Sequence, residues 1–231
     1  MLAGFSFISL LLSDSFSLVS ADRQHTVSAL ILRPSEFTMH DYEAMLEAGA
    51  NRLILGPSIA VASGTVLVPG DINKTFMSEI HDLTQKYNAE VYLSVSPLFN
   101  KGDNTSGFKQ GFADSIREHF KTFYLDGVVV DSYAMLDYVE AVQAMGDIVR
   151  GTYTWSWNRA VAALKFSSDE DSWSFVEQVD PSPHFHYAIC SLDNDSMSPK
   201  IYKSIAWTDE VLQKWDNITR AVQIPNSDGS G

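Results

Sequence analysis

The sequence has a single cysteine, Cys190, in 231 residues, so no disulfide can form within the chain. Small secreted domains often depend on disulfides, and without them a buried apolar core must supply the stability. Cys190 follows Tyr187-Ala188-Ile189 in an apolar run, where a free cysteine is usually buried and unreactive. The sequence therefore predicts one large domain with a substantial core.

Basic residues are also few: 16 Lys and Arg oppose 29 Asp and Glu, which gives a formal net charge of −13. This charge repels phosphate backbones, and the basic residues are scattered instead of forming a stripe, so a nucleic-acid partner is disfavoured. Mean hydropathy near zero leaves no room for several membrane spans. An acidic surface is compatible with neutral ligands such as sugars.

The first segment, Met1 to Ala21, has an apolar centre and ends in the small residues Val19-Ser20-Ala21. This pattern predicts a secretory signal peptide, although no Lys or Arg precedes the apolar centre; the alternative is a buried first helix. Four Asn-x-Ser/Thr sequons agree with secretion and predict an extracellular glycoprotein. The predicted glycosylation sites are Asn73, Asn104, Asn194 and Asn217.

Strand-like apolar runs alternate with helical periodicity along the chain. The pattern predicts strands at 27–32, 52–55, 91–95, 123–133, 148–157, 185–191 and 201–207. It predicts one helix that begins at Thr38, one that contains Phe76 to Tyr87, one that contains Phe112 to Phe120, and one that follows Tyr133. It also predicts helices at 160–164 and 174–178, and a last helix that contains Val211, Leu212, Trp215 and Ile218. Such alternation predicts parallel strands joined by right-handed crossovers.

An eight-fold barrel typically needs about 250 residues, with roughly 200 as the lower limit. Seven predicted strands in this length therefore indicate an α/β fold of the (β/α)8 TIM-barrel type, compact or incomplete. The predicted organisation is a signal peptide over 1–21, one barrel domain over 22–224 and a disordered tail over 225–231.

The stretch Phe123 to Tyr133 carries the candidate site. Successive strand side chains alternate faces, so Val129, Asp131 and Tyr133 point one way. Barrel enzymes keep their catalytic residues at the carboxyl ends of strands, which makes Asp131 a candidate. The alternative is that Asp131 only caps the following helix by accepting its amide hydrogens.

This stretch resembles the signature of glycoside hydrolase family 18, the chitinases and chitinase-like lectins, whose fourth strand reads Asp-Gly-x-Asp-x-Asp-x-Glu. Asp126-Gly127 and Asp131 match that pattern, whereas Val129 replaces the middle acid and Tyr133 replaces the glutamate. The resemblance implies a barrel fold and a glycan site. It also implies that the proton donor has been lost.

Other segments resemble the family in the same order along the chain. Ser94-Val95-Ser96-Pro97 resembles its Ser-x-Gly-Gly segment without the glycines, and Asp193 stands where the family has the acid of Met-x-Tyr-Asp. Trp207 resembles the tryptophan that forms the floor of the sugar site. Trp155 and Trp157, on the predicted fifth strand, either stack on sugar rings or fill the barrel. The implied glycan-binding residues are Asp131, Tyr133, Trp155, Asp193 and Trp207.

Family members use one glutamic acid to protonate the leaving oxygen, while the acetamido group of the substrate attacks the anomeric carbon. A tyrosine has a pKa of about 10 in model peptides, so it is a poor proton donor near neutral pH. Losing a general acid typically lowers the rate about 10²- to 10⁴-fold. Val129 also removes the carboxylate that would tune Asp131. Asp137 and Glu140 are the available substitute acids, on the following helix.

The sequence therefore predicts a secreted chitinase-like protein without hydrolase activity that binds chitin or another N-acetylglucosamine-containing glycan. The alternatives are a weakly active glycosidase with a different general acid, and a barrel that serves as a scaffold for a protein partner. His184 and His186 share a strand face as a metal pair would, but no third ligand stands at a suitable spacing. We predict no metal, no cofactor and no membrane contact after signal removal.

Overall fold

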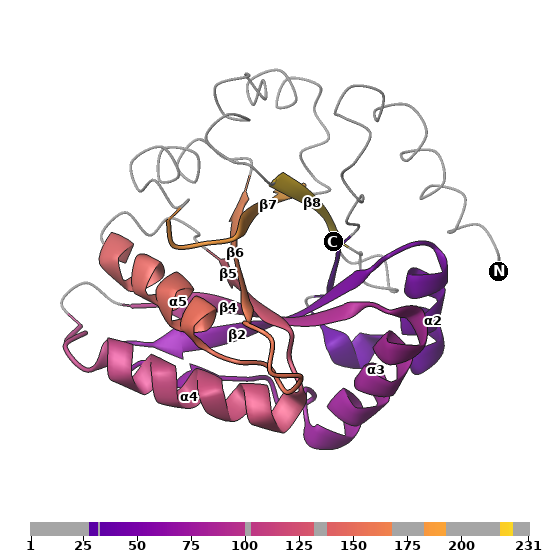
Figure 1. The fold of residues 1–231 in the computed structure, drawn as a ribbon, viewed down its shortest axis with the longest axis horizontal. Coiled ribbons are helices and arrows are strands. Elements are labelled where there is room, and N and C mark those ends of the chain that lie inside the picture. Colours follow the sequence, from indigo (N-terminus) through magenta and orange to yellow (C-terminus); the bar gives the residue numbers. More distant parts are fainter. Residues whose placement is uncertain are drawn as a thin grey trace, which may run out of the picture.

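The computed structural model describes residues 28–31, 33–99, 103–131, 138–167, 183–192 and 218–223. Strands and helices alternate, and helices α2 to α5 lie outside a ring of strands (Figure 1). The strands are β1 (Ser28–Ile31), β2 (Arg52–Val61), β3 (Val66–Leu67), β4 (Glu90–Leu98), β5 (Gly127–Asp131), β6 (Val161–Ser167), β7 (Tyr187–Leu192) and β8 (Ile218–Gln223). The helices are the short 3-10 helix Pro34–Glu36, α2 (Met39–Glu47), α3 (Lys74–Tyr87), α4 (Phe108–Phe123) and α5 (Val139–Gly151).

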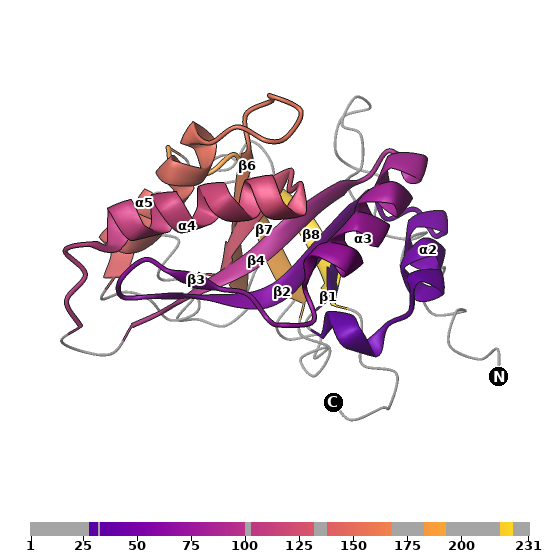
Figure 2. The ribbon, with the colours of Figure 1, turned by 90° about the horizontal axis from the view of Figure 1, so that it is seen from below.

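The sheet closes on itself, because β1 pairs in parallel with both β2 and β8. The described residues form an 8-stranded sheet in the order β1-β8-β7-β6-β5-β4-β2-β3. Only β3 in this sheet is antiparallel, and it extends the far end of β2 (Figure 2). The predicted α/β barrel with a parallel sheet is confirmed, and its ring consists of the seven parallel strands β1, β2, β4, β5, β6, β7 and β8.

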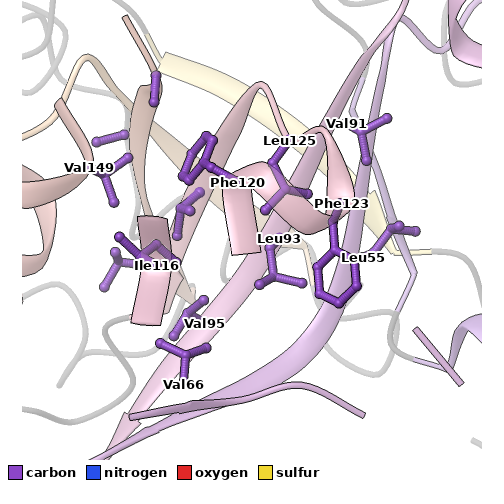
Figure 3. Close-up of a cluster of buried hydrophobic side chains, with 14 of the residues drawn as sticks. Leu55, Val66, Val91, Leu93, Val95, Ile116, Phe120, Phe123, Leu125 and Val149 are labelled. Atoms are coloured by element: carbon purple, nitrogen blue, oxygen red, sulfur yellow. The ribbon is translucent and has the colours of Figure 1, made fainter. Parts of the chain in front are cut away.

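Alternating side chains of each strand build two apolar layers. The outward-facing layer packs against the helices, as Leu93 and Val95 of β4 do beside Ile116 and Phe120 of α4 (Figure 3). Among the side chains that the structure describes, the inward-facing layer in the middle of the barrel includes Leu30, Ile54, Tyr92, Val129 and Ala163. A barrel filled in this way is a packed core, so ligand contacts must come from the strand ends and loops.

A polar network lies inside the amino-terminal end of the barrel. Arg52 forms an ion pair with Glu90 at 2.7 Å, and its guanidinium lies 4.5 Å from the ring centre of Tyr92. The Tyr92 hydroxyl donates to Glu90 Oε2 at 3.0 Å. These contacts satisfy charges near the amino-terminal end of the barrel axis. We call the opposite, carboxyl-terminal end of the strands the mouth.

Local signals placed the first helix correctly. The Thr38 side chain accepts the backbone N–H of Asp41 and the Asp41 carboxylate accepts the N–H of Thr38, the predicted capping box. Gly49 follows α2 with φ 103°, a conformation that favours glycine. At α3 the Asn73 side chain accepts hydrogen bonds from Thr75 and Phe76.

Strand β2 is longer than predicted. The sequence suggested an end at Gly56-Pro57, but the strand continues to Val61 after a shift of register against β4 between Leu55 and Ser58. The proline is tolerated because the irregularity removes it from the regular ladder. The added length leads into the hairpin with β3, and no secondary structure was predicted for the residues of β3.

The predicted strand at 148–157 and the predicted helix at 160–164 are both wrong. Residues 148–151 end α5, where the buried Val142, Met145 and Val149 continue its helical face, and the strand is β6 at Val161–Ser167. Ala162, Ala163 and Leu164 are good helix formers, but their small or apolar side chains suit the crowded barrel wall. Tertiary packing overrides propensity here.

Ile218 was predicted on an amphipathic helix and instead begins β8. The run that predicted a strand at 185–191 gives β7. The signal peptide, the elements predicted at 174–178 and 201–207, and the tail at 225–231 lie outside the described residues. Among the described helices, none combines the length and the apolar character needed to cross a membrane.

Close backbone contact between the β2–β3 hairpin and α4 gives a test of the packing. A Cβ atom at Gly111 of α4 would lie 2.0 Å from the Ser63 carbonyl oxygen. We expect Gly111→Ala to destabilise the protein by about 1–3 kcal/mol in urea unfolding, although alanine is the better helix former by roughly 1 kcal/mol. Gly151→Ala, also helical but with nothing within 4 Å of the added atom, is the control. Equal stability of both variants would contradict the contact.

Candidate functional site at the mouth of the barrel

Asp131 and Lys165 form an ion pair at the carboxyl-terminal mouth. Asp131 ends β5, Lys165 lies beside it in register on β6, and Lys165 Nζ lies 2.7 Å from Asp131 Oδ2. Neighbours in register on adjacent strands point to the same side of the sheet, which brings the two side chains together. The side chains are only 14% and 18% exposed for Lys165 and Asp131 respectively, so the pair is largely shielded from water.

Val129 lies one layer below this pair. It is fully buried in the barrel interior with Ala163, while Val128 and Val130 pack outward under the helices. Val129 and Asp131 therefore share the inward face, as the alternation of β5 predicts. Tyr133, which would continue this face, lies outside the described residues, as do Asp193 and Trp207.

Ser94 lies next to Val129 in register on β4, and it is 1% exposed. A Cβ atom at Gly56 of β2 would lie 2.7 Å from Ser94 Cβ, so glycine at position 56 leaves room for the serine. Ser94 is the serine that the sequence retains from the family segment. It forms part of the wall beneath the mouth.

Sequence reasoning missed Lys165. The predicted helix at 160–164 ended just before it, so no strand partner was considered for Asp131. A strand over 161–167 would have placed Lys165 on the same face as Val161 and Ala163, at the carboxyl end. A single lysine at the end of an apolar strand was therefore the available signal.

The pairing with Lys165 changes what Asp131 can do. An ammonium at hydrogen-bond distance offsets the negative charge that the carboxylate would otherwise present to a ligand. The pair still offers an acceptor and a donor side by side. Such an arrangement suits an amide or hydroxyl group of a neutral ligand better than a developing positive charge.

Asp126, the first acid of the signature, lies at the opposite end of β5. Its Oδ2 accepts the backbone N–H of Val91 at 2.9 Å, and burial raises the pKa of this carboxyl. A Cβ atom at Gly127 would lie 2.6 Å from the Val161 carbonyl oxygen and 2.9 Å from the Tyr92 ring. Asp126 and Gly127 thus hold three strands together and do not face the mouth.

Trp155 does not share a site with Asp131, contrary to expectation. It lies in the turn between α5 and β6, before β6 begins beside Gly127. The four residue steps along β5 from Gly127 to Asp131 separate the two levels by roughly 13 Å at about 3.3 Å per residue, and the apolar layer lies between them. The error follows from the misplaced fifth strand.

The two histidines have separate partners. His184 Nδ1 lies 2.9 Å from Asp147 Oδ1, whereas His186 Nδ1 accepts the Ala162 backbone N–H at 3.0 Å. Burial lowers the pKa of His186. Within the described ranges, no three His, Cys, Asp or Glu side chains gather as metal ligands would.

Comparison with known proteins gives a match at the level of structure. No protein-family model matches the sequence, and no significant match was found among curated proteins. The tamarind chitinase-like lectin superposes with a TM-score of 0.60 at 12% identity, covering 88% of this chain and 95% of the lectin. A group IV chitinase from Ostrinia furnacalis gives a TM-score of 0.56 at 14% identity, covering 73% and 51%.

The chain has the fold of the chitinases and chitinase-like lectins. A class V chitinase from Nicotiana tobaccum agrees, with a TM-score of 0.51 at 12% identity. The chain spans about half the length of the two chitinases, 51% and 52%, and nearly all of the lectin. At these identities the likeness concerns the fold, and it agrees with the resemblance of residues 126–131 to glycoside hydrolase family 18.

A double-mutant cycle tests the mouth pair. We expect Asp131→Asn and Lys165→Met each to cost about 1–3 kcal/mol in urea unfolding, because Asp131→Asn removes the negative charge beside the shielded Lys165 ammonium and Lys165→Met removes the positive charge beside the shielded Asp131 carboxylate. The double variant should cost less than the sum, with a coupling of about 1 kcal/mol or more. The exposed Arg33–Glu36 pair is the control, with an expected coupling below about 0.5 kcal/mol. Equal coupling in both pairs would contradict the shielded pair.

The raised pKa of Asp126 predicts a pH dependence. The folded state holds this proton more tightly than the unfolded state, so the contribution favours folding at low pH and is lost as pH rises through the raised pKa. Asp126→Asn keeps an acceptor for Val91 and removes the titration. Its stability relative to the native chain should therefore increase between about pH 4 and about pH 7. Exposed Asp114→Asn serves as the control, and parallel pH profiles for the native chain and Asp126→Asn would refute the prediction.

Proposed function

We propose that this protein is a secreted chitinase-like lectin that binds chitin or another N-acetylglucosamine-containing glycan at the mouth of the barrel and does not hydrolyse it. The observation that carries the proposal is the ion pair of Asp131 with Lys165, in a barrel with the chitinase and chitinase-like lectin fold. The pair retains a polar, shielded contact point at the mouth.

Four observations argue against hydrolysis. Val129 is fully buried and apolar where the family signature has an acid beside Asp131. Lys165 offsets the charge of Asp131, and the sequence has Tyr133 at the proton-donor position. Glu140, a candidate substitute acid, is exposed in the first turn of α5, which belongs to the outer helical layer. Asp137 lies outside the described residues.

Structural relatives make a saccharide the ligand to test. The Ostrinia furnacalis chitinase has been solved with allosamidin, and a mutant of the tobacco chitinase with NAG4. In the proposed complex, Asp131 accepts the acetamido N–H of one sugar, and the Lys165 ammonium donates to a sugar oxygen. Tyr133 and Trp207 would add aromatic surface, and Asp193 a further acceptor.

Secretion and glycosylation are part of the proposal. They are supported by the apolar segment 1–21 and by the sequons. Asn73 and Asn104, the two sequon asparagines within the described ranges, are both exposed. Both use their side-chain oxygen in local hydrogen bonds, and the Asn73 amide nitrogen, the atom that glycosylation modifies, also donates to the Asp71 carbonyl oxygen at 3.4 Å.

Calorimetry with chitotetraose tests the binding. We expect saturable binding by the native chain and affinity lower by about tenfold or more for Asp131→Asn and Lys165→Met, since each removes a charge-assisted hydrogen bond. Asp114→Asn, at an exposed carboxylate of α4, should bind as the native chain does. Circular dichroism would first establish that each variant is folded at the temperature of the titration.

A chromogenic chitobioside assay provides the second arm of the same test. No turnover above buffer is expected from the native chain. If the native chain did turn the substrate over and Asp131→Asn abolished that turnover, the protein would be a weak glycosidase instead of a lectin. Absence of binding by the native chain would overturn the glycan site and favour a protein-binding scaffold.

A further inference from the structure

Exposed aromatic side chains gather at the amino-terminal end of the barrel, opposite the mouth. We define the amino-end aromatic cluster as Tyr124, Tyr153, Trp155 and Trp157, which are 45%, 51%, 42% and 83% exposed. Tyr124 joins α4 to β5, and the other three belong to the connection from α5 to β6. Both connections precede the strands, so the cluster lies at the strands' amino ends.

The cluster is held in place by packing. The His81 ring of α3 lies 5.3 Å from the Tyr124 ring and 4.9 Å from the Trp155 ring, and Tyr124 and Trp155 meet edge to face at 6.5 Å. Arg159 stacks over Tyr153 at 4.2 Å. Rings oriented before a ligand arrives lose little conformational freedom on binding, which favours recognition.

A hydrogen-bonded turn presents Trp157 to solvent. The Thr154 N–H donates to Asn158 O at 2.9 Å, and the Trp157 N–H donates to Thr154 O at 3.1 Å. Trp157 has φ 64°, in the left-handed region that large side chains seldom occupy. The backbone thus bears a conformational cost while Trp157 remains 83% exposed and gains little burial. Folding alone does not account for that arrangement.

The composition of the turn indicates the class of ligand. Residues Thr152 to Asn158 read Thr-Tyr-Thr-Trp-Ser-Trp-Asn, so aromatic rings alternate with hydroxyl and amide groups and no residue is charged. Protein interfaces are enriched in Tyr, Trp, Met and Arg and poor in Ser, and anionic membranes attract clusters of Lys and Arg. Arg159 follows the turn and stacks on Tyr153, but within the turn the rings alternate with Thr, Ser and Asn. A surface of flat apolar rings with neutral hydroxyl and amide groups suits a polyhydroxylated, uncharged ligand.

We propose that the amino-end aromatic cluster is a second glycan-contact surface, which stacks the apolar faces of neutral sugar rings on Trp157 and Trp155. The surface is separate from the mouth, and the proposal does not depend on Asp131 or Lys165. Two contact surfaces at opposite ends of one barrel would let a single molecule touch two chains of a polysaccharide. The net charge of −13 makes neutral polysaccharides better partners than acidic ones.

Affinity electrophoresis tests the second surface, since the acidic chain migrates in native gels. The probes are hydroxyethyl cellulose and glycol chitin, two neutral soluble polysaccharides. We expect both to retard the native chain, and Trp157→Ala to weaken binding to both by about fivefold to tenfold, the effect of losing one stacking contact. Trp157→Phe should recover part of the retardation because it restores a ring. Asp114→Asn, at an exposed carboxylate of α4 away from both surfaces, should behave as the native chain does.

The outcomes separate the two surfaces. Asp131→Asn should weaken binding to glycol chitin alone, whereas Trp157→Ala should weaken binding to both polymers, so one proposal can fail while the other stands. Unchanged retardation of Trp157→Ala in both gels would overturn the second surface. Two other results would also overturn it, if Trp157→Ala left the retardation unchanged. If Trp157→Ala abolished a dimer seen in sedimentation, the cluster would bind another copy of the chain. If Trp157→Ala abolished binding to neutral lipid vesicles, the cluster would bind a membrane.

Discussion

Closure of the parallel sheet is the constraint on which the rest of the structure depends. Because β1 pairs with both β2 and β8, each strand has two neighbours and an inward face that meets the inward faces of the others. In the described part of the barrel, the interior layer holds Leu30, Ile54 and Tyr92 with the smaller Val129 and Ala163. Other apolar side chains of the strands, such as Leu93 and Val95, face outward and pack against the helices.

The same closure fixes the positions of the charges. Glu90 and Arg52 neutralise one another at the amino end of the axis, Asp131 and Lys165 do so at the mouth, and the apolar layer lies between the two pairs. A charge near the axis is costly without a partner, because it has little access to water. The proposed loss of catalysis is therefore coupled to packing: with Val129 in place of an acid, Lys165 is the charged partner that Asp131 retains at the mouth.

Much of the fold could be predicted from local signals, and the site only in part. Runs such as 91–95 with caps such as Thr38 specify buried strands and helix starts, and these were placed correctly. The helix predicted at 160–164 was wrong because Ala and Leu favour helices in isolation, whereas here their small or apolar side chains fit the crowded barrel wall as part of a strand. That error moved Trp155 to the wrong end and hid Lys165. Which residues meet across strands is decided by register, which composition does not reveal.

The pairing of β1 with β8 differs from every other contact in the described ring. Each of the other parallel pairs joins strands that follow one another in the ring's sequence order, whereas Ser28 meets Ala221 across 221 − 28 = 193 residues. Closing so long a loop carries the largest entropy cost in the sheet, and contacts of this range slow folding. The described ring is thus a series of strands in sequence order that one long-range pairing, between β1 and β8, closes. Both proposed binding surfaces have their described residues between β4 and β6, the part of the ring farthest from that pairing.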